Sequence, residues 1–394
     1  MQPLRFYKYS LNGNTFVFVD ETQGPQLSEN QKSEFAYRAA NSYFGIGADN
    51  LILLQPSTQS ILDKINSIRN YWGCPPKAGE ADFIFRMFEP DGTEAFSCGN
   101  GLTCIANHLH RHYSLDRARI MTQVPLEIPQ VLTVGADTAN HMNWTNLGQA
   151  RRVPGFMVQT PTEPINGKPL ERIEKLKVSF SEVHPEHPTR TPPLDLNGYL
   201  VFTGEPHLVF LADGNFPDPH IAAALFASGN GKKTGEASAD LRRGSYNSWL
   251  VHYIGTYINR TYKQFFPCGI NVNFMHVTEM GDAIEYRCFE RGIYHETLAC
   301  GTGAVAVSAV IRHLGLYPGD TYTLHPHRCR WYKPDAEFIV RHTENGWYLY
   351  GRPDLLYKGD FPWQPEQLGT NQMERTLMPP GQPHTSQRVA AHEH

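Results

Sequence analysis

The feature that most constrains this chain is a short motif that occurs twice in the same local setting. The segments TEAFSCGNG (93–101) and HETLACGTG (295–303) both read Glu-x-x-x-Cys-Gly-x-Gly. Each follows a predicted strand and a turn, and each opens an apolar stretch with the spacing of a helix. A motif that is repeated together with its structural context indicates an internal duplication. We therefore expect two similarly built domains that face one another.

The elements around the two motifs follow the same order in both halves. Alternating or continuous apolar runs predict strands at 15–20, 51–54, 82–88, 208–213, 271–278 and 284–290. A helix is predicted at about 28–43, and two more begin directly after Cys98 and Cys300. Gly315 is placed to end the last of these helices as its C-cap. Segments 56–81 and 227–248 are polar and rich in turn-forming residues, which predicts a surface insertion and a mobile loop.

The composition excludes several classes of function. The chain has 394 residues, 40% of them hydrophobic, which is enough for two globular domains. A formal net charge of −4 and the lack of long basic runs argue against a nucleic-acid partner. The first residues have no signal-peptide core, and the nearly apolar run 298–311 is too short to span a bilayer. We expect a soluble cytoplasmic protein with a small-molecule ligand and no membrane or nucleic-acid partner.

Seven irregularly spaced cysteines favour a reducing compartment over a disulfide framework. We interpret Cys74, Cys268 and Cys288 as inert. A zinc site would use Cys104, His108 and His112, which share a helical face, or the cluster of His325, His327 and Cys329. Neither spacing has a second matching half, so we predict no metal and no cofactor.

Each repeated motif places a cysteine where its thiolate is favoured. The first turn of a helix carries unpaired N–H groups and the positive end of the macrodipole, and both lower the pKa of a thiol. The glycines that follow allow a ligand to approach the backbone, whose N–H groups bind anions. Two such elements face to face can hold one carboxylate with a sulfur on each side of its α-carbon. One thiolate then removes the α-proton while the other thiol protonates the opposite face, which inverts the centre.

Six blocks of the sequence resemble, in order, those of the diaminopimelate epimerase family. The blocks are GNTFVFVD (13–20), GIGADN (45–50), FEPDGTEAFSCGNG (88–101), GEPHLVFLAD (204–213), FPCGINVNF (266–274) and ERG with ETLACGTGA (290–304). The resemblance implies an α/β (α+β) fold of two pseudo-symmetric domains, each a curved sheet around a central helix. It implies an active site in the cleft between them, a pyridoxal-phosphate-independent isomerase activity on an amino acid, and Cys98 and Cys300 as the acid/base pair. A homodimer is also expected.

The resemblance also assigns residues around the cysteines. Those that would bind the reacting amino-acid head or line its pocket are Asn14, Gly99, Asn100, His207, Asn271, Glu290, Arg291, Gly301 and Thr302. Of these, His207 and Glu290 would lie close enough to the thiols to set their protonation. The glutamates of the two motifs, Glu94 and Glu296, we interpret as structural residues that bind backbone near each helix start.

The sequence departs from the family at the far end of the substrate. Glu89 and Glu205 stand where diaminopimelate epimerases normally carry asparagines that hold the distal group. Two carboxylates there repel a distal carboxylate and favour a distal cation. We therefore predict a substrate with a basic side chain, such as lysine, ornithine, arginine or histidine. Arg291 is retained and is able to neutralise the glutamates, so diaminopimelate stays an alternative.

Two further alternatives remain open. A proline racemase-like or carbon–carbon isomerase activity belongs to the same fold, although CGNG preceded by PDGTE favours the diaminopimelate group. A non-catalytic amino-acid-binding or thiol-redox protein would keep the fold without the reaction. We place the domains at 1–125, completed by a strand near 353–360, and at 126–352, followed by a disordered tail over 364–394.

Overall fold

The computed structural model describes residues 2–184, 191–212, 216, 219–227, 245–278, 281 and 283–364. Most of the predicted loop 227–248 and all but the first residue of the predicted tail 364–394 fall outside these residues, and the end of the predicted loop, 246–248, is helical instead. Helices lie at α1 (Gln31–Ala40), α2 (Gln59–Arg69), η1 (Ala78–Glu80), α3 (Gly99–Tyr113), α5 (Pro219–Leu225), α6 (Tyr246–Thr261), α7 (Gly301–Leu314) and α8 (His327–Arg330). Helix α2 and η1 occupy the segment 56–81 that was predicted as a surface insertion.

The strands of the first half are β1 (Gln2–Leu11), β2 (Asn14–Asp20), β3 (Asn50–Pro56), β4 (Phe83–Phe88), β5 (Glu94–Ala95), β6 (Arg117–Thr122), β7 (Gln130–Asp137) and β8 (Met142–Asn146). They pair in the order β1–β2–β3–β4–β6–β7–β8. The pairs β2–β3 and β4–β6 are parallel and the others antiparallel, and β5 adds to β4. Helix α1 connects the first parallel pair and α3 connects the second.

The second half comprises β9 (Glu163–Pro164), β10 (Glu171–Val178), β11 (Leu194–Phe202), β12 (Pro206–Leu211), β13 (Asn271–Val277), β14 (Ile284–Glu290), β15 (His295–Glu296), β16 (Thr321–Pro326), β17 (Phe338–Thr343) and β18 (Gly346–Gly351). The order β11–β12–β13–β14–β16–β17–β18 repeats the first half, with parallel pairs β12–β13 and β14–β16 and with β15 added to β14. The pairing therefore confirms the predicted pseudo-symmetric architecture.

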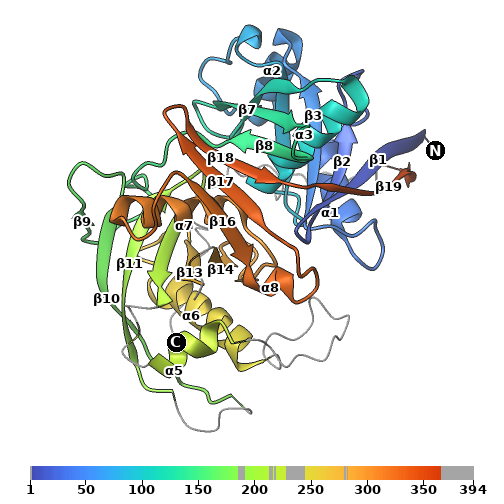
Figure 1. The fold of residues 1–394 in the computed structure, drawn as a ribbon. Helices are drawn as coiled ribbons and strands as arrows, with labels where there is room; N and C mark the ends of the chain where they lie inside the picture. Colours follow the sequence, from blue (N-terminus) through green and yellow to red (C-terminus); the bar gives the residue numbers. More distant parts are fainter. Residues whose placement is uncertain are drawn as a thin grey trace, which may run out of the picture.

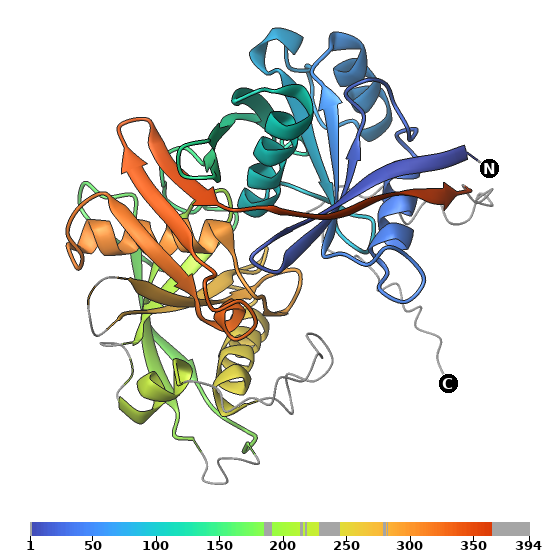
Figure 2. The ribbon, with the colours of Figure 1, turned by 45° about the vertical axis from the view of Figure 1, so that its right-hand side comes forward.

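The two halves join through their sheets (Figure 1). Strand β18 pairs with β8, and β19 (Asp354–Trp363) leaves the second half to pair antiparallel with β1. In the rotated view, β19 crosses from the orange strands to the blue ones (Figure 2). The domain boundaries proposed from the sequence stay a prediction.

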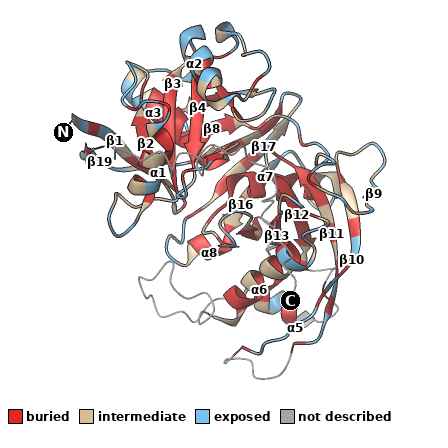
Figure 3. Ribbon diagram, turned by 180° about the vertical axis from the view of Figure 1, so that it is seen from behind, coloured by how far each residue is buried: buried red, intermediate tan, exposed pale blue. Residues whose placement is uncertain are grey.

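Each half wraps its sheet around one central helix. All residues from Gly99 to Leu109 in α3 and from Gly301 to Ile311 in α7 are buried, so only the last turn of each helix reaches solvent. Figure 3 shows the continuous buried surface of the strands that surround them. Helices α1 and α6 cover the opposite faces of the sheets through separate apolar clusters. Among the described residues, no helix combines the length and hydrophobicity that a membrane crossing requires.

A buried arginine supports the turn before each central helix. Arg86 in β4 makes two hydrogen bonds to Glu94, and Arg287 in β14 binds both oxygens of Glu296 at 2.6 Å. Both guanidinium groups are fully buried. The motif glutamates are thus structural, as expected, but their partners are arginines of the adjacent strand, because a bidentate guanidinium satisfies a buried carboxylate.

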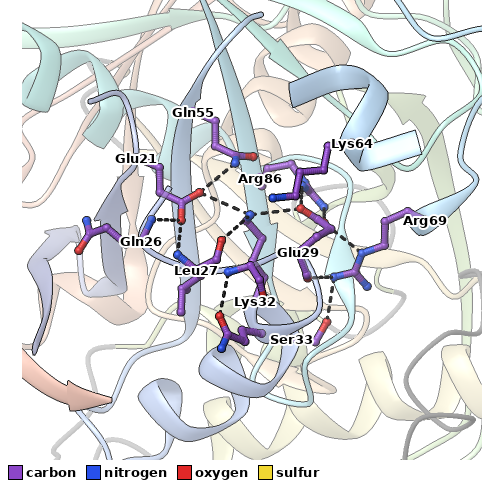
Figure 4. A network of polar contacts seen from close by, with 12 residues as sticks. Glu21, Gln26, Leu27, Glu29, Lys32, Ser33, Gln55, Lys64, Arg69 and Arg86 are labelled. Atoms are coloured by element: carbon purple, nitrogen blue, oxygen red, sulfur yellow. Dashed lines mark hydrogen bonds and ion pairs between the residues drawn. The ribbon is translucent and has the colours of Figure 1, made fainter. Parts of the chain in front are cut away.

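In the first half, this pair extends into a larger polar network (Figure 4). Arg86 also forms an ion pair with Glu29 at 2.7 Å, and Glu29 forms further ion pairs with Arg69 and Lys32. Lys32 approaches Glu21 at 3.4 Å, which links the network to the end of β2. Together these cations hold the pKa of Glu29 below its usual range despite its burial. The network ties α1 to the strand that leads to Cys98.

Candidate active site

The first turns of the two central helices meet, so both cysteines lie at one place. An added Cβ on Gly301 would come within 2.5 Å of Asn100 Oδ1, and one on Gly99 within 3.7 Å of the Thr302 nitrogen. The contact at Gly301 leaves no room for a side chain, whereas the distance at Gly99 is an ordinary van der Waals contact that makes α3 and α7 neighbours. The structure therefore brings Cys98, Gly99, Asn100, Cys300, Gly301 and Thr302 together.

Each cysteine is the N-cap of its helix. The Cys98 sulfur accepts the Gly101 N–H at 3.5 Å, and the Cys300 sulfur accepts the Gly303 N–H at 3.3 Å. The preceding N–H groups of each first turn have no intrahelical partner and remain able to bind an anion.

The two sulfurs differ in their environments. The pKa of Cys300 is lowered, chiefly by the neighbouring Cys288 thiol and further by Thr302 and the Gly303 N–H, although burial opposes this. Burial raises the pKa of Cys98 well above its usual value. The Cys98 S–H donates to Asn14 Oδ1 at 3.8 Å. The expectation that both thiols are acidified is therefore wrong for Cys98, because desolvation outweighs the helix N-terminus there.

A chain of hydrogen bonds orients Thr302 toward Cys300. The Asn273 amide donates to His207 Nδ1 at 3.0 Å, which leaves the proton of the neutral imidazole on Nε2. His207 Nε2 lies 3.1 Å from Thr302 Oγ1, so the Thr302 hydroxyl is free to donate to Cys300 Sγ at 3.5 Å. Burial, with a smaller effect from Arg291, lowers the pKa of His207 to about 3, so the ring is neutral at pH 7.

The glutamates expected at the far end of the substrate have partners of different kinds. Glu205 accepts Arg291 Nε at 2.7 Å and a second bond from Arg291 Nη2, which forms a partly buried ion pair. Glu89 accepts only the Asn50 amide among the described side chains, at 2.8 Å. Burial, reinforced by Asp91, raises the pKa of Glu89 to about 7. Asn271, which was predicted to line the pocket, accepts the Arg291 backbone N–H at 2.8 Å.

Glu290 lies beside Cys300 together with Cys288. One ligand atom each from Cys288, Glu290 and Cys300 falls within 4.8 Å of the others, and this is the group with metal-like spacing among the described residues. Burial and the neighbouring Cys300 raise the pKa of both Cys288 and Glu290, so both hold their protons. A protonated thiol and carboxyl are hydrogen-bond donors, and we assign no metal to this group.

Two residues of this site escaped the sequence analysis. Asn273, which sets the His207 tautomer, reads as one position of an alternating strand. Cys288 reads as a buried small residue of β14, and only its alignment with Cys300 across the fold gives it a role. The histidines considered for a zinc site have other partners: His108 contacts Asp20 and Tyr9, and His327 contacts Glu285.

Comparisons with known proteins give relatives of similar sequence and solved structures of similar fold. Residues 6–130 match the family model described as diaminopimelate epimerase. The diaminopimelate epimerases of Methanothrix thermoacetophila and Archaeoglobus fulgidus are each 28% identical, over 82% and 79% of this chain and 85% and 83% of theirs. A Bacillus anthracis protein of the PhzF family superposes with a TM-score of 0.51 at 10% identity, over 92% of this chain and 99% of that one. A hydroxyproline epimerase from Agrobacterium vitis gives 0.51 at 12% identity, over 91% and 92%.

The solved structures share the two-domain fold, and the relatives of similar sequence are epimerases, which places the chain among isomerases of that kind. Within that class, the chain is a homologue of the diaminopimelate epimerases.

Proposed function

We propose that this chain inverts the α-carbon of an amino acid without a cofactor, with Cys98 and Cys300 as its acid/base pair. The observation that carries the proposal is that each cysteine caps a central helix and that the two first turns are in contact. Their environments assign the starting roles. Cys300, stabilised as thiolate, removes the α-proton, and the Cys98 thiol protonates the opposite face. The return reaction starts from the exchanged protonation states.

The first turns of α3 and α7 would stabilise the carbanionic intermediate. Their N–H groups are fixed before the reaction and point to the place where negative charge develops on the carboxylate, which is the most effective form of electrostatic stabilisation. Asn100 supports a bound polar head as well, because its Oδ1 is buried and has no hydrogen-bond partner among the described residues. An α-ammonium group is a suitable donor for that oxygen.

The pairing of Arg291 favours a cationic far end on the substrate. All three guanidinium nitrogens already donate, two to Glu205 and Nη1 to the Cys268 carbonyl at 2.9 Å. A distal carboxylate would have to compete with Glu205 for them. Among the described residues, Glu89 has no cationic partner of this kind, and a bound ammonium or guanidinium would favour its ionised form. We therefore propose lysine, ornithine, arginine or histidine as the substrate class.

Diaminopimelate is the second candidate. Two observations support it: the curated relatives carry that name, and Arg291 is present to receive a distal carboxylate if Glu205 releases it. Its distal ammonium would then face Glu89 and Glu205.

Hydrogen exchange separates these substrates. We expect the reduced protein in D2O to exchange the α-proton of one basic amino acid and to invert its chirality, as followed by NMR and chiral chromatography. Turnover of LL- or meso-diaminopimelate alone would contradict the basic-substrate proposal. Exchange with none of the compounds would contradict the reaction itself.

The source of the selectivity is tested by restoring the family's amides. We expect the double variant Glu89→Asn/Glu205→Asn to lose about tenfold or more in kcat/KM for the basic substrate, because it removes two carboxylates and leaves Arg291 unpaired. The same variant should gain activity on diaminopimelate. Glu337→Gln, which removes a half-buried carboxylate paired with Arg352, is the control. An unchanged ratio of the two activities would show that the glutamates do not select the substrate.

A further inference from the structure

The pseudo-symmetry of the fold makes the differences between the two halves informative. Arg86 and Arg287 occupy equivalent places in β4 and β14, and the residues that follow them are Met87 and Cys288. The register confirms the equivalence, because Phe88 pairs with Glu94 as Phe289 pairs with Glu296. Both Met87 and Cys288 are buried. A thioether has no proton to donate, whereas a thiol is a hydrogen-bond donor.

We propose that Cys288 is a positioning residue that donates its S–H to the Cys300 sulfur, so that the resting protein carries its negative charge on Cys300 and its reactive proton on Cys98. This inference rests on the proposed two-cysteine reaction. Its consequence is that the resting protein is prepared for one of the two enantiomers.

The geometry around β14 supports this role. Cys288 and Glu290 are two positions apart on one strand, so their side chains point to the same face. That face is turned toward the start of α7, where the sulfur of Cys300 lies within 4.8 Å of the Cys288 sulfur and of a Glu290 oxygen. Cys288 is 2% exposed and Cys300 is 5% exposed, so both sulfurs are shielded from bulk water.

The donors around the two catalytic sulfurs are correspondingly unequal. The donors beside the Cys300 sulfur are the Cys288 thiol, the protonated Glu290, the Thr302 hydroxyl and the Gly303 N–H. The Cys98 sulfur accepts hydrogen bonds from backbone N–H groups, and its S–H donates a hydrogen bond to Asn14. Hydrogen bonds to the charged form of a group stabilise that form. The titratable groups near the Cys300 sulfur are Cys98, Cys288 and Glu290. Tyr286 is also a neighbour, since its hydroxyl donates to the Cys300 backbone carbonyl at 2.9 Å.

Two substitutions at Cys288 distinguish the effect of losing the hydrogen-bond donor from the effect of changing the side-chain shape. Cys288→Val removes the proton at similar volume, whereas Cys288→Ser keeps a donor. In the whole protein, the pH dependence of Cys300 alkylation by iodoacetamide, read by peptide mass spectrometry, reports its thiolate directly. We expect about tenfold slower alkylation at neutral pH in Cys288→Val, with the profile moved to higher pH. Cys288→Ser and the equivalent-position control Met87→Leu should keep the parent profile.

The kinetic consequence is equally specific. A catalyst cannot change an equilibrium, so kcat/KM should fall by the same factor for both enantiomers in Cys288→Val. If that variant does not fold, Cys288→Ala, also without a donor, replaces it. An unshifted Cys300 profile in a folded donor-free variant would overturn the inference while leaving the reaction intact. A shifted profile in a protein that inverts no amino acid would support the contact and overturn the proposed function.

Discussion

Replacing Cys300 with alanine is expected to lower kcat/KM for inversion by about 10²- to 10⁴-fold, the range for loss of a general acid or base. Cys98→Ala should cause a comparable loss, because inversion requires a proton donor on the face opposite the base. The two variants should differ in exchange. Cys98→Ala keeps the Cys300 thiolate and should still exchange the α-proton of one enantiomer in D2O without inverting it. Cys300→Ala should lose that exchange.

The matched control is Cys329→Ala. Cys329 is also a buried cysteine, but its sulfur donates to the Asn12 carbonyl at 3.2 Å and not to either catalytic cysteine. Its loss should leave kcat/KM within about twofold of the parent, as for a change remote from the reacting groups. Full activity in either Cys98→Ala or Cys300→Ala would show that another pair carries the protons.

Removing Glu296 should destabilise the protein by about 3–5 kcal/mol, the cost of leaving one partner of a buried ion pair uncompensated. In the Glu296→Leu variant, Arg287 keeps its bonds to the Leu225 carbonyl and to Ser248 but loses its only carboxylate among the described contacts. The measurement is the free energy of unfolding from urea titration, followed by fluorescence and circular dichroism together.

A double variant tests whether the loss of stability comes from the uncompensated charge of Arg287. Arg287→Met/Glu296→Leu removes both charges and should recover part of the loss, although the Leu225 carbonyl then lacks its donor. The surface pair of Arg312 and Asp320 is the control, since Asp320→Ala should cost no more than about 1 kcal/mol. A loss of that small size in Glu296→Leu would show that the buried pair does not hold the turn before Cys300.

Much of the fold was predictable because it depends on local patterns. Short apolar runs located β2, β4, β12, β13 and β14, which are buried along most of their length, and the glycine after the last helical residue located the end of α7. The helix α2 was not predicted, because the segment around it is dominated by turn-forming residues. The pairing of the strands was expected only as a duplication, since register depends on contacts between residues far apart in sequence.

The sequence by itself determined the class of chemistry, because a cysteine followed by Gly-x-Gly at a helix start has the same local physics wherever it occurs. Two such starts in equivalent settings required two similar domains and indicated an acid/base pair. Only the tertiary structure decided that the pair is unequal. Burial keeps the proton on Cys98, whereas Cys288, Thr302 and Gly303 converge on Cys300 from β14 and α7. Protonation depends on desolvation and on hydrogen bonds between distant segments, and neither can be read from the order of residues along the chain.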